Sequence, residues 1–433
     1  MSSVLVCGGG NAAQVCATLF ASRQDISGQR RYKVTAFSLY DQEAARWDKI
    51  VQQAGYMECY LHAQKKIVKA KPDRITNDPK SVANCDIVLL TVPSSFHEKY
   101  FSALEPYVKD GTIFVVMPAR SGCDFLFRKI MGAKTPKLGL AAFETLPWAC
   151  RFKDWGRTTE VLGTKETVGA AVMPPVGVAA EQEFHKLQIL LGEQPRIIRC
   201  PNVMSISLGN PGQVVHPGIT YSRWKSWDGK PLDKKPLFYH GADDFCASIV
   251  SGISDDIQAI CKTLRKLDGK FDTSTVKTIH EFYMTAYSTQ CKDTSTLQRA
   301  MVTNSAYDGL THPMKGDDKT GYTPDFQFRY LSDDVPTGLC FIRGLAELLR
   351  VKTPTIDTVM YWCQDKLGKE FLTKGGRMAG KDIGRSRAPQ AYGITTSRQL
   401  LEFLQIKPVP IYKVPCATCG SVAGAIATMC SPS

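Results

Sequence analysis

A glycine-rich turn close to the N-terminus constrains the fold of this chain more than any other feature. The sequence VLVCGGGNAAQVCATLFAS runs from an apolar segment, residues 4–7, through three glycines into an apolar-periodic segment, residues 11–22. Strand, glycine turn and helix in this order form the fingerprint of a dinucleotide-binding unit. The pattern therefore predicts a Rossmann-type domain at the start of the chain.

Each fingerprint position has its own physical task. Gly8 allows the tight turn, Gly10 lets backbone N–H groups approach a pyrophosphate, and Ala13 keeps the helix close to the strand. The N-terminus of the helix then faces the phosphates with its partial positive charge. The cofactor contacts expected from this segment are Gly8, Gly10, Asn11, Ala12 and Ala13.

An acidic residue is expected after the second strand, KVTAFSLY, where it would bind the adenosine ribose. Asp41 is the candidate, although an inserted polar loop, residues 22–31, places it farther from Gly8 than the usual twenty or so residues. A carboxylate accepts the ribose hydroxyls but repels a 2′-phosphate, so Asp41 favours NAD over NADP. Arg46 lies near enough to weaken that preference.

Three continuous apolar runs follow at residues 86–96, 112–122 and 137–148. Continuous rather than alternating apolar residues are typical of strands buried on both faces of a parallel sheet. Ligands bind at the carboxyl ends of such strands, so we expect Pro93, Ser94, Arg120 and Glu144 near one cleft. A plain strand-ending turn explains Pro93 and Ser94 equally well.

The hydrophobic period changes near residue 205. Residues 243–267, 274–288, 336–351 and 355–371 carry apolar residues three and four apart, which predicts amphipathic helices. We therefore expect an α/β protein with a Rossmann-type domain at 1–204, an all-helical substrate domain at 205–415 and a flexible tail at 416–433. The one CxxC motif, Cys416 to Cys419, lies in that tail and lacks a second ligand pair, so we interpret it as tail rather than a zinc or redox site.

Composition limits the partners of the chain. The formal net charge of +13 is spread over 433 residues without a recognisable nucleic-acid module, so small anionic ligands explain it at least as well as nucleic acid. No apolar run reaches the roughly eighteen residues of a membrane span. The fifteen cysteines are irregularly spaced and often lie in apolar runs, which indicates a reducing cytoplasmic compartment. No residue set has metal-ligand spacing.

Several long motifs together resemble the octopine dehydrogenase family of opine dehydrogenases. They are VCGGGNAA, IVLLTVPSSFHEKYF, FETLPWACR, VVHPGITYSRWKSWDGKP, PDFQFRYLSDDVPTG and GKDIGRSRAPQAYG, and the resemblance covers roughly residues 3–400. It implies an enzyme that condenses pyruvate with the amino group of an amino acid and reduces the imine with NADH, regenerating NAD in anaerobic glycolysis. It also implies small-molecule partners only, in a monomer or homodimer.

The resemblance assigns three central residues. His216 matches the acid/base histidine, Asp334 the carboxylate that orients it, and Arg329 the arginine that binds the pyruvate carboxylate. Taken alone, each residue has a simpler explanation: a turn histidine before Pro217, an N-cap, and a surface arginine. Pro217 is expected to restrict the backbone and so orient the imidazole.

Departures from the arginine-using branch concern the amino donor. Arg120 stands where that branch is expected to carry glutamine, and a guanidinium repels a cationic substrate. Binding of a cofactor phosphate, or a side chain that points to solvent, explains Arg120 equally well. Asn210 and the two residues after it stand where the arginine-using branch is expected to carry bulkier side chains, which changes the shape of the pocket. We therefore expect a neutral or anionic donor such as glycine, alanine, β-alanine or taurine. Further donor-site candidates, which packing would explain equally well, are Glu144, Cys150 and Phe282.

Two other functions remain open on the sequence alone. One is an NAD(P)-dependent hydroxy-acid or sugar-phosphate dehydrogenase with a helical second domain. Such enzymes commonly use a lysine and an asparagine near the same place, and Asn210 is a candidate for that asparagine. The other is a non-catalytic NAD-binding sensor, which would keep the glycine turn without needing His216, Asp334 and Arg329 to converge.

Overall fold

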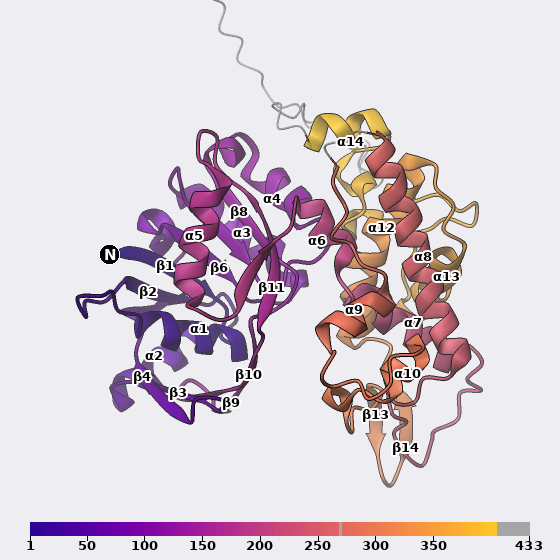
Figure 1. Cartoon of the computed structure of the whole chain (residues 1–433), viewed down its shortest axis with the longest axis horizontal. Helices are drawn as coiled ribbons and strands as arrows, with labels where there is room; N and C mark the ends of the chain where they lie inside the picture. The colour runs from indigo at the N-terminus through magenta and orange to yellow at the C-terminus, as the bar shows by residue number, and fades with distance from the viewer. Residues whose placement is uncertain (268–270, 405–433) are drawn as a thin grey trace, which may run out of the picture.

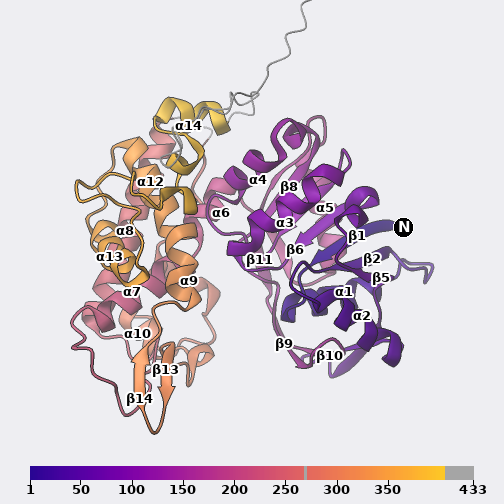
Figure 2. The same cartoon turned by 180° about the vertical axis from the view of Figure 1, so that it is seen from behind.

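The protein folds into two lobes, a sheet-containing N-terminal lobe and a helical C-terminal lobe (Figure 1 and, from behind, Figure 2). The computed structural model describes residues 1–267 and 271–404. The predicted tail at 416–433, with Cys416 and Cys419, lies outside the described residues. No helix in the described part of the chain is long and apolar enough to cross a membrane.

An eight-stranded sheet forms the centre of the N-terminal lobe, in the order β12-β11-β8-β7-β6-β1-β2-β5. Six neighbouring strands are parallel and follow the doubly wound order, with β1 and β6 side by side where the order reverses. These six are β1 (Ser2–Cys7), β2 (Tyr32–Phe37), β5 (Arg74–Thr76), β6 (Ile87–Leu90), β7 (Ile113–Val116) and β8 (Gly139–Phe143). β11 (Thr167–Met173) runs antiparallel to β8, and β12 (Arg196–Arg199) is parallel to β11.

The parallel strands are buried on both faces, as the continuous apolar runs predict. In β1, Val4 and Val6 belong to one core cluster, whereas Leu5 and Cys7 belong to a cluster on the opposite face. Helices cover both faces: α1 (Asn11–Ala21), α2 (Glu43–Ala54), α3 (His97–Leu104), α4 (Cys123–Met131) and α5 (Ala180–Leu191). The Rossmann-type prediction is confirmed.

A second, four-stranded sheet was not predicted. Its order is β4 (Lys66–Ala70), β3 (Met57–Leu61), β10 (Thr158–Thr164) and β9 (Trp148–Asp154). β4 and β9 are largely exposed, and polar or charged residues interrupt the apolar residues of all four strands, so their sequences lack the continuous apolar run of a strand buried on both faces. The hairpin of β9 and β10 nevertheless matters for the site, because it contacts the glycine turn.

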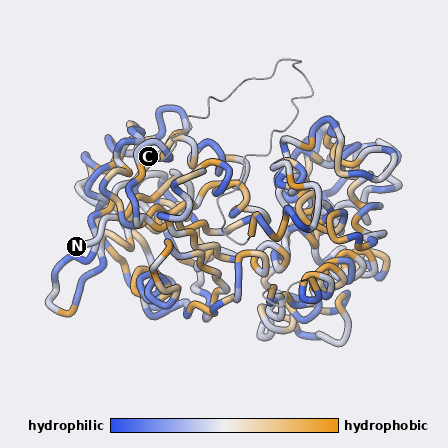
Figure 3. Tube along the Cα trace, turned by 90° about the horizontal axis from the view of Figure 1, so that it is seen from above, coloured by the Kyte–Doolittle hydropathy of each residue, from blue (hydrophilic) through white to orange (hydrophobic). Residues whose placement is uncertain are grey.

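The C-terminal lobe is built from helices around one core, and the four predicted helical segments are all present. Figure 3 shows hydrophobic stretches gathered inside this lobe and hydrophilic turns around it. The helices are α6 (Val203–Gly209), α7 (Gly212–Trp224), α8 (Asp244–Leu267), α9 (Ile279–Ala286), α10 (Leu297–Val302), α11 (Arg329–Ser332), a π-helical turn (Val335–Leu339), α12 (Cys340–Leu349), α13 (Pro354–Leu367) and α14 (Ser397–Leu404). A hairpin of β13 (Met314–Asp317) and β14 (Gly321–Pro324) is added, so the domain is not purely helical.

Short 3-10 turns connect several elements. They span Pro79–Asn84, Ser94–Phe96, Glu105–Tyr107, Gly132–Lys137, Ser305–Tyr307, Ile383–Arg385 and Pro389–Tyr392. The sheet ends at Arg199 and α6 begins at Val203, so the domain boundary predicted after residue 204 falls inside α6.

Pro217 lies in the interior of a helix. Both His216 and Pro217 lie inside α7, which begins after Pro211. Pro217 has no N–H to donate to the carbonyl of Gln213 four residues earlier, so one helical hydrogen bond is missing beside His216. The imidazole is therefore presented by a helix whose backbone Pro217 restricts.

Aromatic packing and a close glycine contact join the two lobes. Phe125 of α4 stacks on Phe403 at 4.5 Å between ring centroids and meets Phe341 edge-on at 5.2 Å. Gly122, just before α4, has φ +67°, and a Cβ there would lie 2.7 Å from the Phe341 ring and 3.3 Å from the carbonyl of Arg387. Only glycine suits both this backbone conformation and this spacing.

Gly122→Ala is therefore expected to destabilise the protein by about 2–4 kcal/mol, from left-handed strain plus overpacking. The matched control is Gly111→Ala, because Gly111 has φ +82° but open space around the added Cβ. We expect it to cost only about 1 kcal/mol. Chemical denaturation measures both, and equal losses would show that the contact with Phe341 contributes nothing.

Candidate active site

The centre of the site is an imidazole fixed by a buried carboxylate. Nδ1 of His216, on α7, lies 2.7 Å from Oδ2 of Asp334, which precedes the π-helical turn. The Asp334 side chain is 1% exposed and that of His216 is 14% exposed. A carboxylate accepts the proton on Nδ1, so Nε2 is the nitrogen left for proton transfer.

An arginine from the other lobe completes the charge arrangement. Arg120 follows β7, and its Nη1 lies 2.8 Å from Oδ1 of Asp334 and 3.2 Å from Oδ1 of Asn210. Burial by itself would raise the pKa of Asp334, but Arg120 and the hydrogen bond from His216 hold it below its ordinary value. Asp334 is therefore ionised at neutral pH and able to stabilise an imidazolium.

Aromatic groups fix the remaining sides of His216. The ring of Tyr330 stacks on the imidazole, with centroids 3.9 Å apart and planes 13° apart. The hydroxyl oxygen of Tyr239 lies 3.2 Å from Nε2. Neither tyrosine was singled out by sequence reasoning, because their contacts join segments whose proximity no local pattern reveals.

A second carboxylate links the site to the end of strand β6. The Ser94 hydroxyl donates to Asp333 and lies 3.1 Å from the Thr337 hydroxyl. Arg387 donates to the carbonyl of Ser94 at 3.0 Å. Ser94 is predicted as a cofactor contact, but its hydroxyl is bound to Asp333 of the helical lobe, the residue just before Asp334.

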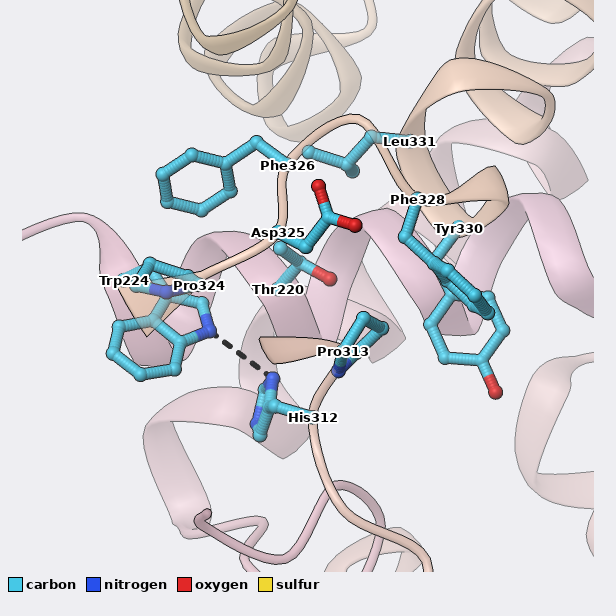
Figure 4. Close-up of a pocket in the computed structure, with 10 residues that line it drawn as sticks. All are labelled: Thr220, Trp224, His312, Pro313, Pro324, Asp325, Phe326, Phe328, Tyr330 and Leu331. Atoms are coloured by element: carbon cyan, nitrogen blue, oxygen red, sulfur yellow. Dashed lines mark hydrogen bonds between the residues drawn. The ribbon is translucent and has the colours of Figure 1, made fainter. Parts of the chain in front are cut away.

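His312, the other histidine before a proline, has a different environment. Its Nδ1 accepts a hydrogen bond from Nε1 of Trp224 at 3.1 Å (Figure 4). The adjoining cavity measures only about 10 Å³, room for one water molecule at most. Burial lowers the pKa of His312 to about 3, so this ring stays neutral and is a packed core histidine.

A pocket of about 220 Å³ opens at the carboxyl ends of β1, β2 and β6. It is lined by the glycine turn and by the loops after β2 and β6, including Pro93. Gly8 has φ +111°, and a Cβ there would lie 2.9 Å from Val92. Gly10 precedes α1 with open space around it, so the free N–H groups of that helix face a site suited to phosphate.

The glycine turn is held from the hairpin of β9 and β10. The carbonyl of Gly9 accepts hydrogen bonds from Gln14 at 2.8 Å and from the Trp155 indole at 3.0 Å. The side chain of Asn11 accepts from the backbone of Phe152 at 2.9 Å. Ala12 and Ala13 are buried in α1, where they allow close packing rather than line the pocket.

Asp41 is not brought to this pocket. It is exposed, has φ +37°, and is absent from the described lining. Glu43, the first residue of α2, lines the pocket instead, accepts a hydrogen bond from Ser38 and lies against Gly9. Strand β2 ends at Phe37, so the turn after it carries Asp41 outward. The sequence signal for Glu43 was an acidic residue in the first turn of the next helix.

The other predicted donor-site residues are dispersed. Glu144, at the end of β8, accepts from the backbone of Gly169 at 2.8 Å. Cys150 is 4% exposed in the N-terminal core, where burial raises its thiol pKa to about 11, so it is a packing residue. Phe282 packs on Tyr287 and does not contact His216 directly. A row of rings separates the two: Tyr287 contacts Tyr307, Tyr307 stacks on Tyr239, and the Tyr239 hydroxyl meets His216.

Arg329 is exposed at the start of α11, beside Tyr330. Within residues 1–267 and 271–404 its guanidinium makes no ion pair with a carboxylate. Its charge nevertheless contributes to the low pKa of Asp334. The arginine is therefore available to an anion that approaches His216.

The helical lobe matches a known family. The family model described as NAD/NADP octopine/nopaline dehydrogenase, alpha-helical domain, matches residues 199–367. An opine dehydrogenase from Haliotis discus hannai is 36% identical over 408 residues, covering 93% of this chain and 99% of the relative. The chain belongs to the opine dehydrogenase family.

Further members of this family of NAD-dependent oxidoreductases are equally similar. The tauropine dehydrogenase of Arabella iricolor is 37% identical, covering 93% of this chain and 100% of the relative, and the octopine dehydrogenase of Pecten maximus is 37% identical, covering 92% and 98%. A solved octopine dehydrogenase with NADH and L-arginine has a TM-score of 0.86 at 36% identity, covering 93% of this chain and 98% of that structure. Because these relatives differ in the amino acid named, they establish the family and leave the amino donor undetermined.

Replacing Asp334 by asparagine tests the buried pair. An asparagine side chain has the same shape but no charge, so it neither enforces the Nδ1–H tautomer nor stabilises the imidazolium. We expect kcat of NADH oxidation to fall by about 10²–10⁴ with little change in NADH affinity. Asp308→Asn is the matched control, since it removes an exposed carboxylate 3.8 Å from His240. Equal activity of Asp334→Asn and the wild type would contradict the assigned role.

Proposed function

We propose that this enzyme condenses pyruvate with a small neutral or anionic amino acid and reduces the product with NADH to an N-(1-carboxyethyl) amino acid. The observation that carries the proposal is His216, whose Nδ1 is held by Asp334, so that Nε2, which meets the Tyr239 hydroxyl, is the nitrogen suited to exchange a proton with a substrate. We infer that the reaction regenerates NAD during anaerobic glycolysis in the cytoplasm. The free thiols of the described cysteines support a reducing compartment.

We expect His216 to carry out two proton transfers in the condensation, one that frees the amine and one that releases water. The neutral ring accepts a proton from the ammonium group of the donor, which frees the amine to attack the carbonyl carbon of pyruvate. The attack leaves a protonated nitrogen and an alkoxide on the same carbon, and one N–H proton passes from that nitrogen to the alkoxide to give a hydroxyl group. The imidazolium then returns its proton to this hydroxyl, which departs as water, so that ammonium and ketone become iminium and water. NADH, when bound, supplies the hydride that reduces the iminium carbon. Asp334 stabilises the cationic state of the ring between the two transfers.

Arg329 would hold the carboxylate of pyruvate. Its guanidinium is exposed, lacks a carboxylate partner in the described residues, and belongs to the same short helix as Tyr330, which stacks on His216. A planar guanidinium binds a carboxylate through two parallel hydrogen bonds, which fixes the ketone in one orientation. This contact would place the carbonyl group beside Nε2.

Arg120 and Asn210 support a neutral or anionic amino donor. Arg120 places a cation within 2.8 Å of Asp334, and a second guanidinium entering beside it would be repelled. The Nδ2 atom of Asn210 is buried and has no hydrogen-bond partner among the described residues. A carboxylate or sulfonate that reached these two side chains would find a cation and an unpaired donor.

NADH consumption with pyruvate tests the function directly. We expect glycine, alanine, β-alanine or taurine to stimulate the reaction, and arginine to be the poorest donor of the panel. Arg120→Gln should shift the preference toward arginine by about tenfold or more, the scale of one charged contact. Reduction of pyruvate with no dependence on any amine would contradict the opine reaction. A strong wild-type preference for arginine would contradict the role of Arg120.

We further propose that Glu43, rather than Asp41, binds the adenosine ribose. Glu43→Gln is expected to weaken NADH binding by about tenfold, because a charged hydrogen-bond acceptor is lost, and to lower the preference for NADH over NADPH. Asp41→Asn is the matched control and should change NADH affinity by less than about twofold, since its side chain lies outside the pocket lining. Fluorescence titration measures both, and the reverse order of effects would restore the assignment to Asp41.

A further inference from the structure

Tyr239 faces the nitrogen on which the proposed chemistry depends. It lies between α7 and α8 in the chain, is 7% exposed, and its hydroxyl oxygen is 3.2 Å from Nε2 of His216. Asp334 occupies the other ring nitrogen at 2.7 Å. The imidazole is thus held at both nitrogens.

The tyrosine itself is firmly placed. Tyr307 stacks on it with centroids 3.7 Å apart and planes 12° apart, and Phe238 meets it edge-on at 4.9 Å. Tyr307 in turn lies 5.3 Å from Tyr287. Burial raises the pKa of Tyr239 well above its ordinary value, so the group remains a hydroxyl throughout the working pH range.

From this geometry we propose that Tyr239 is a positioning residue that keeps Nε2 of His216 aimed and favours the protonated ring. The inference rests on the proposed acid/base role of His216. A hydroxyl both donates and accepts, so it donates to Nε2 of the neutral ring and accepts from Nε2–H of the imidazolium. The second hydrogen bond is charge-assisted and roughly twice as strong, so the net effect of Tyr239 is to stabilise the cation.

Other groups facing His216 set the background for this effect. Asp334 favours the imidazolium, and the guanidinium groups of Arg120 and Arg329 oppose it. Tyr330 covers one ring face, and its own pKa is raised by burial, so it adds no charge. None of these groups except Tyr239 is placed against Nε2 by a described hydrogen bond. Removing its hydroxyl therefore changes one interaction at the reacting nitrogen.

Tyr239→Phe tests the proposal because phenylalanine keeps the ring and its stack. We expect kcat for amine-dependent NADH oxidation to fall about tenfold at neutral pH, with NADH affinity unchanged. In the pH–rate profile, the limb that rises with pH, on which the ring loses its proton and becomes the base, should move to lower pH by about half a unit to one unit, since the imidazolium loses more than the neutral ring does. A thermal melt verifies that the variant is folded.

Tyr307→Phe is the matched control. It removes a hydroxyl from the ring stacked on Tyr239 and leaves the partners of His216 intact. We expect an unshifted pH profile. If Tyr239→Phe leaves both kcat and the pH profile unchanged, or if both variants shift the profile equally, the positioning role is wrong. His216→Gln distinguishes failure of the positioning role of Tyr239 from failure of the proposed function: if His216→Gln keeps wild-type turnover, the acid/base role of His216, and with it the proposed function, is wrong.

Discussion

The buried carboxylate of Asp334, held between an imidazole and a guanidinium, is the interaction on which the site depends. His216 reaches it from the helical lobe and Arg120 from the end of a strand in the sheet lobe. A carboxylate that is 1% exposed is stable as an anion only while its partners are in place. The two lobes must therefore remain together for the imidazole to keep its orientation.

The strand ends that line the pocket beside the glycine turn also contact the helical lobe. Pro93 lines the pocket, and the next residue, Ser94, donates to Asp333 beside the central carboxylate. Arg387 binds the carbonyl of Ser94, and Gly122 packs on Phe341. The residue that follows the pocket-lining Pro93 is thus hydrogen-bonded to the segment that carries Asp334.

The parts of the molecule that sequence predicts are those governed by local patterns. The glycine turn, the parallel strands and the long helices each leave a periodic or compositional signature. Glu43 leaves only the weak signal of an acidic residue in the first turn of a helix, and the hairpin of β9 and β10 leaves none, because the importance of both arises from contacts with Gly9 in space. The turn that would have explained a histidine before Pro217 is not present, since both residues lie inside α7. The pairing of His216 with Asp334 spans 118 residues and was expected only through the family resemblance. Tyr239 was missed because nothing in its local sequence marks its contact with His216.

The tautomer of His216 is the most direct test of the central claim. Ring ¹⁵N chemical shifts of the full-length protein, with His216 assigned by comparison with His216→Gln, report which nitrogen carries the proton when the ring is neutral. We expect a proton on Nδ1, donated to Asp334, and none on Nε2, which accepts from the Tyr239 hydroxyl. A neutral ring protonated on Nε2 would contradict it, because that ring could not accept a proton from the substrate at the nitrogen that faces it.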